Sequence, residues 1–271
     1  MRIIFIGDVY GQSGRRALET HLPQLKQTLK PDVTIVNVDN ASHGHGITDK
    51  HADSIFALGA DCLTGGDHIW DQRVIIPYIA RQPKLLRPEN FPAKTPGHGA
   101  YKVQTEGGQT CLVIHVFGRV FTKALDDPFA AVNKIVEVHK MNRDVDAIFV
   151  DFHAEATSEK MAMGHYLDGR VSAVIGTHTH IPTADYHIMV HGTAFQADAG
   201  MTGDFDSVIG ARKDIPVQKF VKQMPGEKMI PSMGEATLCG CLVVTDDKTG
   251  LAKSISPIRM GGVLSPVLPQ I

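Results

Sequence analysis

Residues 2–12 of the chain read RIIFIGDVYGQ, and this short stretch contains a pattern that recurs along the rest of the sequence. The apolar run from Arg2 to Gly7 predicts a strand that is too uniformly apolar to have one face in water. Asp8 ends this run, and residues 12–30 then show helix-like spacing. A buried strand, a polar residue at its end and a following helix are typical of a layered α/β domain.

The same alternation of apolar runs and helical patterns continues to about residue 200. Further strands are predicted at residues 33–38, 61–64, 111–116, 147–150, 171–175, 194–197 and 242–245. Further helices are predicted at residues 48–58, 128–141 and 157–167. We expect the proline- and glycine-rich residues 82–99 to form a plain connection, and residues 200–235 to wrap the surface before the final strands. We expect one domain over residues 1–271.

The composition is that of an ordinary globular protein, with 43% hydrophobic and 21% charged residues. A formal net charge of -2 gives no field that would attract the whole molecule to nucleic acid or an anionic membrane, so neither DNA nor a membrane is an expected partner. The apolar run before Asp8 is too short for a secretory or membrane-spanning segment, and we therefore expect a cytoplasmic protein. The cysteines at 62, 111, 239 and 241 lack CxxC spacing, which indicates buried thiols rather than a catalytic or zinc-thiolate site.

Residues that can bind a metal follow five of the predicted strands, at the point where each strand ends. They are Asp8, Asp39 with Asn40, Asp67 with His68, His153, and His178 with His180. Ligands of open α/β sheets bind beyond the carboxyl ends of the strands, so we expect these side chains to converge on one place. A single such residue would be explained by a helix cap or a core histidine. The joint burial of the whole set requires compensation, and we interpret the set as a metal site.

The types of donor limit the choice of metal. Carboxylate, amide and imidazole groups without thiolates suit iron, manganese, zinc or cobalt. Six or seven ligands are too many for one ion with an open position, so we predict two ions that share the carboxylate of Asp39. His68 is either the general acid of a phosphoester cleavage or a histidine that only hydrogen-bonds a ligand, and we favour the acid. Glu155 either orients a histidine or begins a helix at the surface.

Six motifs along the chain are together specific for one family. FIGDVYGQSGR, NVDNASHGHGIT, GGDHIWD, VDFHAEATSEK, GTHTHIPTAD and DAGMTGDFDSVIG resemble, in order and spacing, the motifs of the calcineurin-like metallophosphoesterases, specifically their YmdB-like branch. The resemblance covers nearly the whole chain and implies a single-domain αββα sandwich of two mixed sheets flanked by helices. It implies that one metal is held by Asp8, Asp39, Asn40 and His180, and the other by Asp39, Asp67, His153 and His178. His68 then matches the proton donor of the family.

The resemblance further implies a phosphodiesterase with iron or manganese in its site. The expected substrate is a small nucleotide phosphodiester, notably a 2',3'-cyclic nucleotide, with 3',5'-cyclic nucleotides and RNA ends as alternatives. The expected mechanism is in-line attack by a hydroxide that bridges two metals, with His68 protonating the leaving oxygen. The competing hypothesis is a regulatory metal- and nucleotide-binding protein with weak catalysis. A homo-oligomer is the default expectation for an enzyme of this size.

Two positions depart from the usual pattern of the branch. Asp39 stands where the branch normally has Glu, and Asp67 stands where it normally has Asn in the GNH motif. Asp39 is still a carboxylate, although it is one methylene shorter. Asp67 replaces an amide by a carboxylate, which is expected to tighten metal binding and to oppose the approach of an anionic phosphate. This second departure motivates the regulatory hypothesis.

Overall fold

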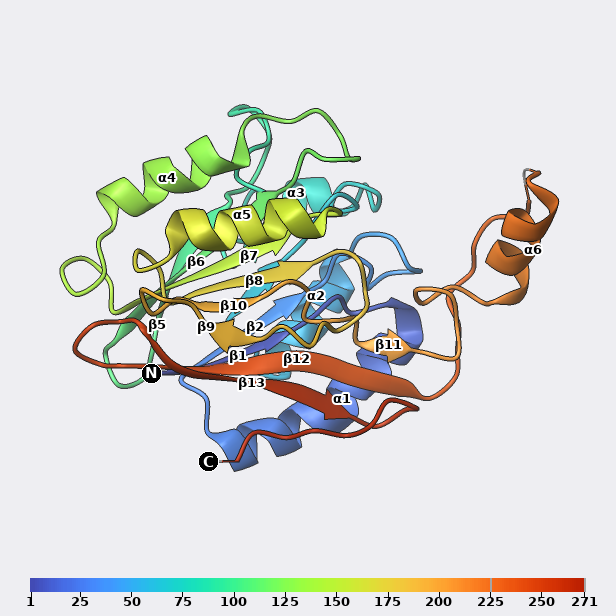
Figure 1. Cartoon of the computed structure of the whole chain (residues 1–271). Helices are drawn as coiled ribbons and strands as arrows, with labels where there is room; N and C mark the ends of the chain where they lie inside the picture. The colour runs from blue at the N-terminus through green and yellow to red at the C-terminus, as the bar shows by residue number, and fades with distance from the viewer. Residues whose placement is uncertain (225, 271) are drawn as a thin grey trace.

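Two mixed β-sheets pack face to face in the computed structural model, which describes residues 1–224 and 226–270 (Figure 1). The first sheet has the order β11-β12-β1-β2-β3-β4, and β13 pairs with β12. Strands β1 to β4 run parallel, whereas β11 and β13 are antiparallel to β12, which is itself antiparallel to β1. The bounds are β1 Arg2–Ile6, β2 Val33–Asn37, β3 Cys62–Thr64, β4 Leu85–Leu86, β11 Gly203–Asp204, β12 Ala236–Thr245 and β13 Ala252–Met260.

The second sheet has the order β5-β6-β7-β8-β10-β9. Its four central strands, β6, β7, β8 and β10, run parallel, and the outer strands β5 and β9 are antiparallel to their neighbours. The bounds are β5 Ala100–Gln104, β6 Thr110–Phe117, β7 Ala147–His153, β8 Ala173–Thr177, β9 His187–Ile188 and β10 Ala194–Gln196. Parallel strands of both sheets therefore bring their carboxyl ends to the same end of the sandwich.

Helices cover the two outer faces of the sandwich (Figure 1). Helices α1 (Gly11–Leu29), α2 (Asp49–Ala57) and α3 (Ile75–Ile79) contribute buried residues to the core on the first sheet, and α4 (Pro128–Val138) and α5 (Thr157–Leu167) to that on the second. Successive residues of a strand point to opposite faces. Ile4 of β1 accordingly packs toward the helices, and Phe5 lies between the sheets, where its ring centroid is 5.1 Å from that of Phe149. The αββα sandwich predicted from the resemblance is confirmed.

The segment between β11 and β12 differs from the prediction. Residues 200–235 were expected to wrap the surface, but they contain β11 and a helix, α6 (Asp214–Lys222), that extends away from the sandwich (Figure 1). Phe220 of this helix is 72% exposed, so its apolar side chain does not pack against the core. An exposed side chain of this kind does not contribute to the buried apolar stripe by which a core helix is recognised.

Further elements were also missed. The predicted connection at 82–99 contributes the short strand β4, because Leu85 and Leu86 pair with β3. The nine-residue strand β13 was not predicted because it pairs with β12 alone, its residues are mostly half-exposed, and it contains Pro257, which is tolerated at such positions. The other predicted helices and strands agree with the structure to within a few residues, except that β12 begins at Ala236, six residues before the predicted start of its strand.

All four cysteines are free and buried, as expected. Burial raises the pKa of the Cys111, Cys239 and Cys241 thiols to about 12, so these groups stay protonated and unreactive at neutral pH. Within the described ranges, no helix combines the length and the apolar character that crossing a membrane requires.

The contact between the two sheets predicts a large effect of truncating Phe149. We expect Phe149→Ala to lower the free energy of unfolding by about 3 to 5 kcal/mol, because it removes buried apolar surface and leaves a cavity. Urea denaturation followed by circular dichroism measures this change. Phe220→Ala makes the same chemical change at an exposed position and should alter the stability by no more than about 0.5 kcal/mol. Equal, small effects of both substitutions would contradict this packing.

Candidate metal centre

His153, the last residue of β7, lies at the centre of a group of carboxylates that come from the other sheet. Its Nε2 atom is 3.5 Å from Asp39 Oδ2 and 3.5 Å from Asp67 Oδ1, and its Nδ1 atom is 3.7 Å from Asp8 Oδ1. Asp8 follows β1, Asp39 follows β2 and Asp67 follows β3. The carboxyl ends of strands from both sheets therefore meet here.

His178 lies beside His153, just after β8. Its Nδ1 atom is 3.1 Å from His153 Nε2 and 3.6 Å from Asp67 Oδ1, and its Nε2 atom is 3.1 Å from Glu155 Oε2. The backbone amide of His178 donates to Asp8 Oδ2 over 3.3 Å. Of the two interpretations of Glu155, the structure favours the one in which it orients a histidine.

Asn40 and His180 form a second pair of facing donors. His180 Nδ1 lies 2.8 Å from the carbonyl oxygen of Ile209, which can only accept, so this nitrogen carries the proton. Burial lowers the pKa of His180, which leaves Nε2 as a free lone pair 3.1 Å from Asn40 Oδ1. The amide nitrogen of Asn40 donates to the carbonyl of Gly44, which fixes its oxygen on the histidine side. Two electron-pair donors that face each other in this way are suited to binding a cation together.

The pKa shifts and the unpartnered oxygens of these carboxylates also indicate a site that suits a cation. Burial raises the pKa of Asp8 to about 8. Burial alone would lower the pKa of His153, but the adjacent carboxylates of Asp39 and Asp67 raise it well above its ordinary value. Three carboxylate oxygens, Asp8 Oδ1, Asp39 Oδ2 and Asp67 Oδ1, are buried without a hydrogen-bond partner. Such oxygens are unfavourable unless a cation contacts them, and the oxygen and nitrogen donors present suit iron, manganese or zinc.

The backbone of the two histidines after β8 is constrained. His178 and His180 have φ angles of 96° and 69°, in the left-handed region that residues other than glycine rarely occupy. Each such conformation costs about 1 to 3 kcal/mol and persists only where the surroundings fix it. Here the buried carboxylate of Asp198 accepts from the amide and the hydroxyl of Thr179, between the histidines, and pairs with Lys160 at 2.8 Å.

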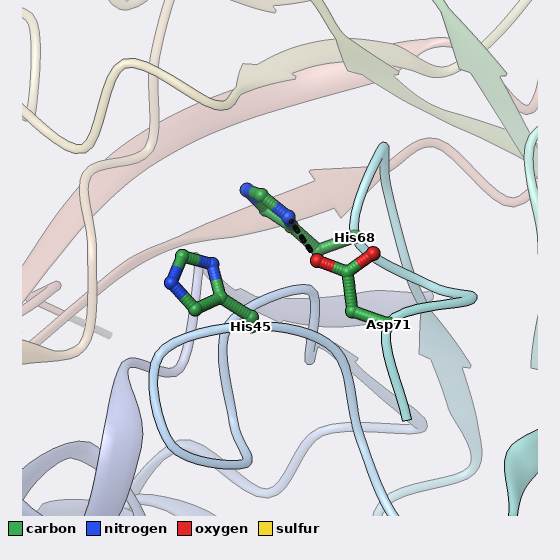
Figure 2. A group of neighbouring side chains, drawn as sticks. All are labelled: His45, His68 and Asp71. Atoms are coloured by element: carbon green, nitrogen blue, oxygen red, sulfur yellow. Dashed lines mark hydrogen bonds and ion pairs between the residues drawn. The ribbon is translucent and has the colours of Figure 1, made fainter. Parts of the chain in front are cut away.

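His68 lies at the more open side of the group, together with His45 and Asp71 (Figure 2). Its backbone amide donates to Asp39 Oδ1 over 3.0 Å, and its Nδ1 atom is 2.8 Å from Asp71 Oδ2. The Nε2 atom is 3.8 Å from Asp67 Oδ2 and so faces the candidate metal ligands. The ring of His45 packs against that of His68 at a centroid distance of 4.8 Å. Gly44 and Gly46, on either side of His45, have positive φ angles, which are typical of the glycines of a turn.

A buried carboxylate, Asp151 of β7, connects the two halves of the centre. Its Oδ1 accepts from the hydroxyl of Thr177, which lies 2.9 Å from His153 Nδ1. Its Oδ2 accepts from the amide of Asn37, whose own oxygen accepts from the backbone of Asp39. One carboxylate therefore orients a histidine from one sheet and an aspartate from the other.

The supporting roles of Asp151 and Asp71 were not predicted from the sequence. A charged side chain inside the apolar run AIFVDF was the available signal for Asp151, because an unpaired charge in a buried strand is unfavourable. Asp71, three residues after His68, gave no local signal that would separate it from a surface aspartate. All eight predicted site residues lie at the same end of the sandwich.

Comparison with known proteins places this arrangement in a family. A family model described as "YmdB-like protein" matches residues 4–258. The chain belongs to the YmdB-like family. It is 43% identical over 258 residues to the 2',3'-cyclic-nucleotide 2'-phosphodiesterase of Bacillus subtilis, with 95% of this chain and 96% of the relative aligned.

Two solved structures are similar to this YmdB-like protein throughout. A hypothetical protein from Thermus thermophilus superimposes with a TM-score of 0.89 at 37% identity, covering 97% of this chain and 100% of the other. A protein described as a novel phosphatase from Mycoplasma pneumoniae gives a TM-score of 0.89 at 32% identity, covering 96% and 93%. The fold of the YmdB-like family and the position of the strand ends are therefore shared.

The role of Asp151 can be tested by a single-atom exchange. Asp151→Asn replaces one carboxylate oxygen by an amide nitrogen that can only donate, so either the hydrogen bond from Asn37 is lost or the one from the Thr177 hydroxyl is reversed. We expect a roughly 10- to 100-fold weaker affinity for Mn²⁺, as for other partners of metal ligands. Titration of metal-free protein with Mn²⁺, followed by calorimetry, measures this. Asp61→Asn makes the same change near the amino end of β3 and should leave the affinity unchanged, whereas equal affinities for all three proteins would contradict the role.

Proposed function

We propose that this protein is a metal-dependent phosphodiesterase that hydrolyses 2',3'-cyclic nucleotides. The observation that carries the proposal is the group of three buried, unpartnered carboxylate oxygens around His153. The identity to the Bacillus subtilis enzyme over nearly the whole length of both chains supports the substrate class. We further propose iron or manganese as the metals, a cytoplasmic location and a homo-oligomeric state.

We assign the ligands of the two proposed ions by the positions of their donors. Asn40 and His180, which face each other, would complete one ion with Asp8, and Asp67, His153 and His178 would hold the other. Asp39 would contact both ions. When bound, the ions would supply Lewis acidity toward the phosphoryl oxygens and activate the attacking water.

The residues of the chain itself would complete the reaction. Hydrolysis forms one bond between a water oxygen and phosphorus and breaks the bond between phosphorus and a ribose oxygen, which must gain a proton. His68 is positioned to give it, because Asp71 engages Nδ1 and leaves Nε2 facing the site. By accepting from Nδ1, Asp71 would also hold the ring in this orientation. Breaking the bond to the 2' oxygen leaves the phosphate on the 3' oxygen.

Metal dependence and product identity test the proposed activity. Protein loaded with Mn²⁺ should convert 2',3'-cyclic AMP to adenosine 3'-monophosphate, because the ions supply both charge neutralisation and an activated water. Removal of metal by a chelator should abolish this activity, and added Mn²⁺ should restore it. Chromatographic separation of the two monophosphates identifies the product. Unchanged turnover after the metal content has fallen well below stoichiometry would exclude the proposal.

The proton-donor role predicts a dependence on the leaving group. His68→Ala should reduce kcat for 2',3'-cyclic AMP by about 10² to 10⁴, the usual contribution of a general acid. The loss should be much smaller for bis(4-nitrophenyl) phosphate, because nitrophenolate leaves without a proton. Steady-state rates with both substrates measure the difference, and the exposed His165→Ala should change neither rate. An equal loss on both substrates would instead mean that His68 supports the metals or the phosphate.

A further inference from the structure

The loop formed by residues 118–125 is attached at both ends to the candidate metal centre. It follows β6, whose last residue, Phe117, lies opposite His153 in the sheet. The amide of Gly118 donates to the carbonyl of His153 over 2.9 Å, and Lys123 Nζ donates to the carbonyl of Asp67 over 2.8 Å. In Figure 1 the chain between β6 and α4 extends beyond the carboxyl ends of the parallel strands. The loop therefore borders the proposed site of hydrolysis.

This loop has a defined conformation because a buried side chain holds it. Glu159, at the start of α5, is 9% exposed and accepts from the amides of Arg119 and Val120 over 2.9 and 3.2 Å. The hydroxyl of Thr122 donates to the carbonyl of Gly118 over 2.6 Å. A buried carboxylate and a closing hydrogen bond therefore fix the turn that carries Phe121.

Phe121 is exposed in a way that the fold does not explain. Its side chain is 90% exposed, although a phenyl ring gains by burial. Its φ angle of 61° lies in the left-handed region, which is unfavourable for a bulky residue. The neighbouring aromatic residue, Phe117, is 1% exposed and already packs against the rings of His153 and His178. Phe121 thus fills no gap in the core, and the anchored loop holds it in solvent next to the site.

We propose that Phe121 is the stacking residue of a nucleobase subsite, an inference that rests on the proposed function. A nucleobase offers a flat π-face to an aromatic side chain, and such stacking tolerates any base. Two cations of the same loop lie two residues to either side of Phe121 in the sequence: Arg119, 3.6 Å from Asp127, and Lys123, whose Nζ donates to the carbonyl of Asp67. They suit the ribose phosphate that a stacked base would bring with it. The ligand is a nucleoside 2',3'-cyclic phosphate, free or at the end of an RNA.

A substrate without a base separates stacking from catalysis. Phe121→Ala should lower kcat/KM for 2',3'-cyclic AMP roughly 5- to 150-fold, mainly through KM, because stacking of one base has this effect. Glycerol 1,2-cyclic phosphate contains the same five-membered cyclic diester without a base, and its hydrolysis should not change. Phe121→Tyr should retain the rate for the nucleotide. Val190→Ala, which truncates a 93% exposed side chain elsewhere, should have no effect on either substrate.

A direct measurement of stacking does not depend on turnover. The chain contains one tryptophan, Trp70, so Phe121→Trp introduces a second fluorophore at the proposed platform. Adenosine 3'-monophosphate should quench the additional emission at concentrations that leave the wild-type emission unchanged, and ribose 5-phosphate should not. The same titration with a short RNA that ends in adenosine 3'-phosphate distinguishes a mononucleotide site from an RNA-end site.

The two proposals fail in different ways. If the wild type hydrolyses neither cyclic diester but Phe121→Trp is quenched, the proposed function is wrong and the nucleobase subsite stands. If Phe121→Ala reduces the rates of both cyclic diesters equally, or of neither, and no quenching occurs, the subsite is excluded while the hydrolase proposal remains. If the substitution changes the oligomeric state measured by light scattering instead, Phe121 is a contact between copies of the chain, and the subsite is also excluded.

Discussion

Buried carboxylates and imidazoles have to be neutralised, and this requirement organises one whole end of the sandwich. Asp8 is fully buried, and its pKa is raised to about 8 by that burial. The carboxylates of Asp39 and Asp67, each 3.5 Å from His153, raise the pKa of that imidazole. A proton held among these groups can balance only part of the negative charge. The remaining unpartnered oxygens explain why a chain of ordinary composition would bind cations here.

The close approach of the strand ends depends on glycine as much as on the ligands. A Cβ atom on Gly66 would lie 2.5 Å from His153 Nε2, so no other residue fits between Thr64 and Asp67 without moving the centre. The same holds at Gly176, where a Cβ atom would lie 1.9 Å from the carbonyl of Ala197. Below this layer, Asp151 connects Thr177 with Asn37 across the two sheets. The packed strands therefore fix the positions of the metal-binding side chains more than the loops do.

The sequence predicted those parts of the fold that depend on local periodicity. The strands before Asp8, Asp39 and His153 are largely apolar runs, and a polar residue ends or follows each one, so both the strands and the candidate ligands could be identified. Asp71 and Thr177 could not, because their importance depends on which side chains come within hydrogen-bonding distance in the folded chain. Strand β13 was missed because only pairing with β12 makes its alternating, partly polar residues a strand.

The carboxylate at position 67 is best understood together with the loop that borders it. Asp67 adds a negative charge where an anionic phosphate would have to approach, and it faces His153 and His178 on the metal side. Its Oδ1 atom lies 3.5 Å from His153 Nε2 and 3.6 Å from His178 Nδ1, so this oxygen would serve as a metal ligand together with the two imidazoles. The ammonium group of Lys123 lies against the main chain of the same residue, on the loop that carries Phe121. A cation at that position offsets the repulsion along the path of the substrate, and stacking of the base adds attraction that is independent of charge. On the proposed function, the exchange of an amide for a carboxylate would be compatible with catalysis, because the neighbouring loop would offset the repulsion from the extra charge.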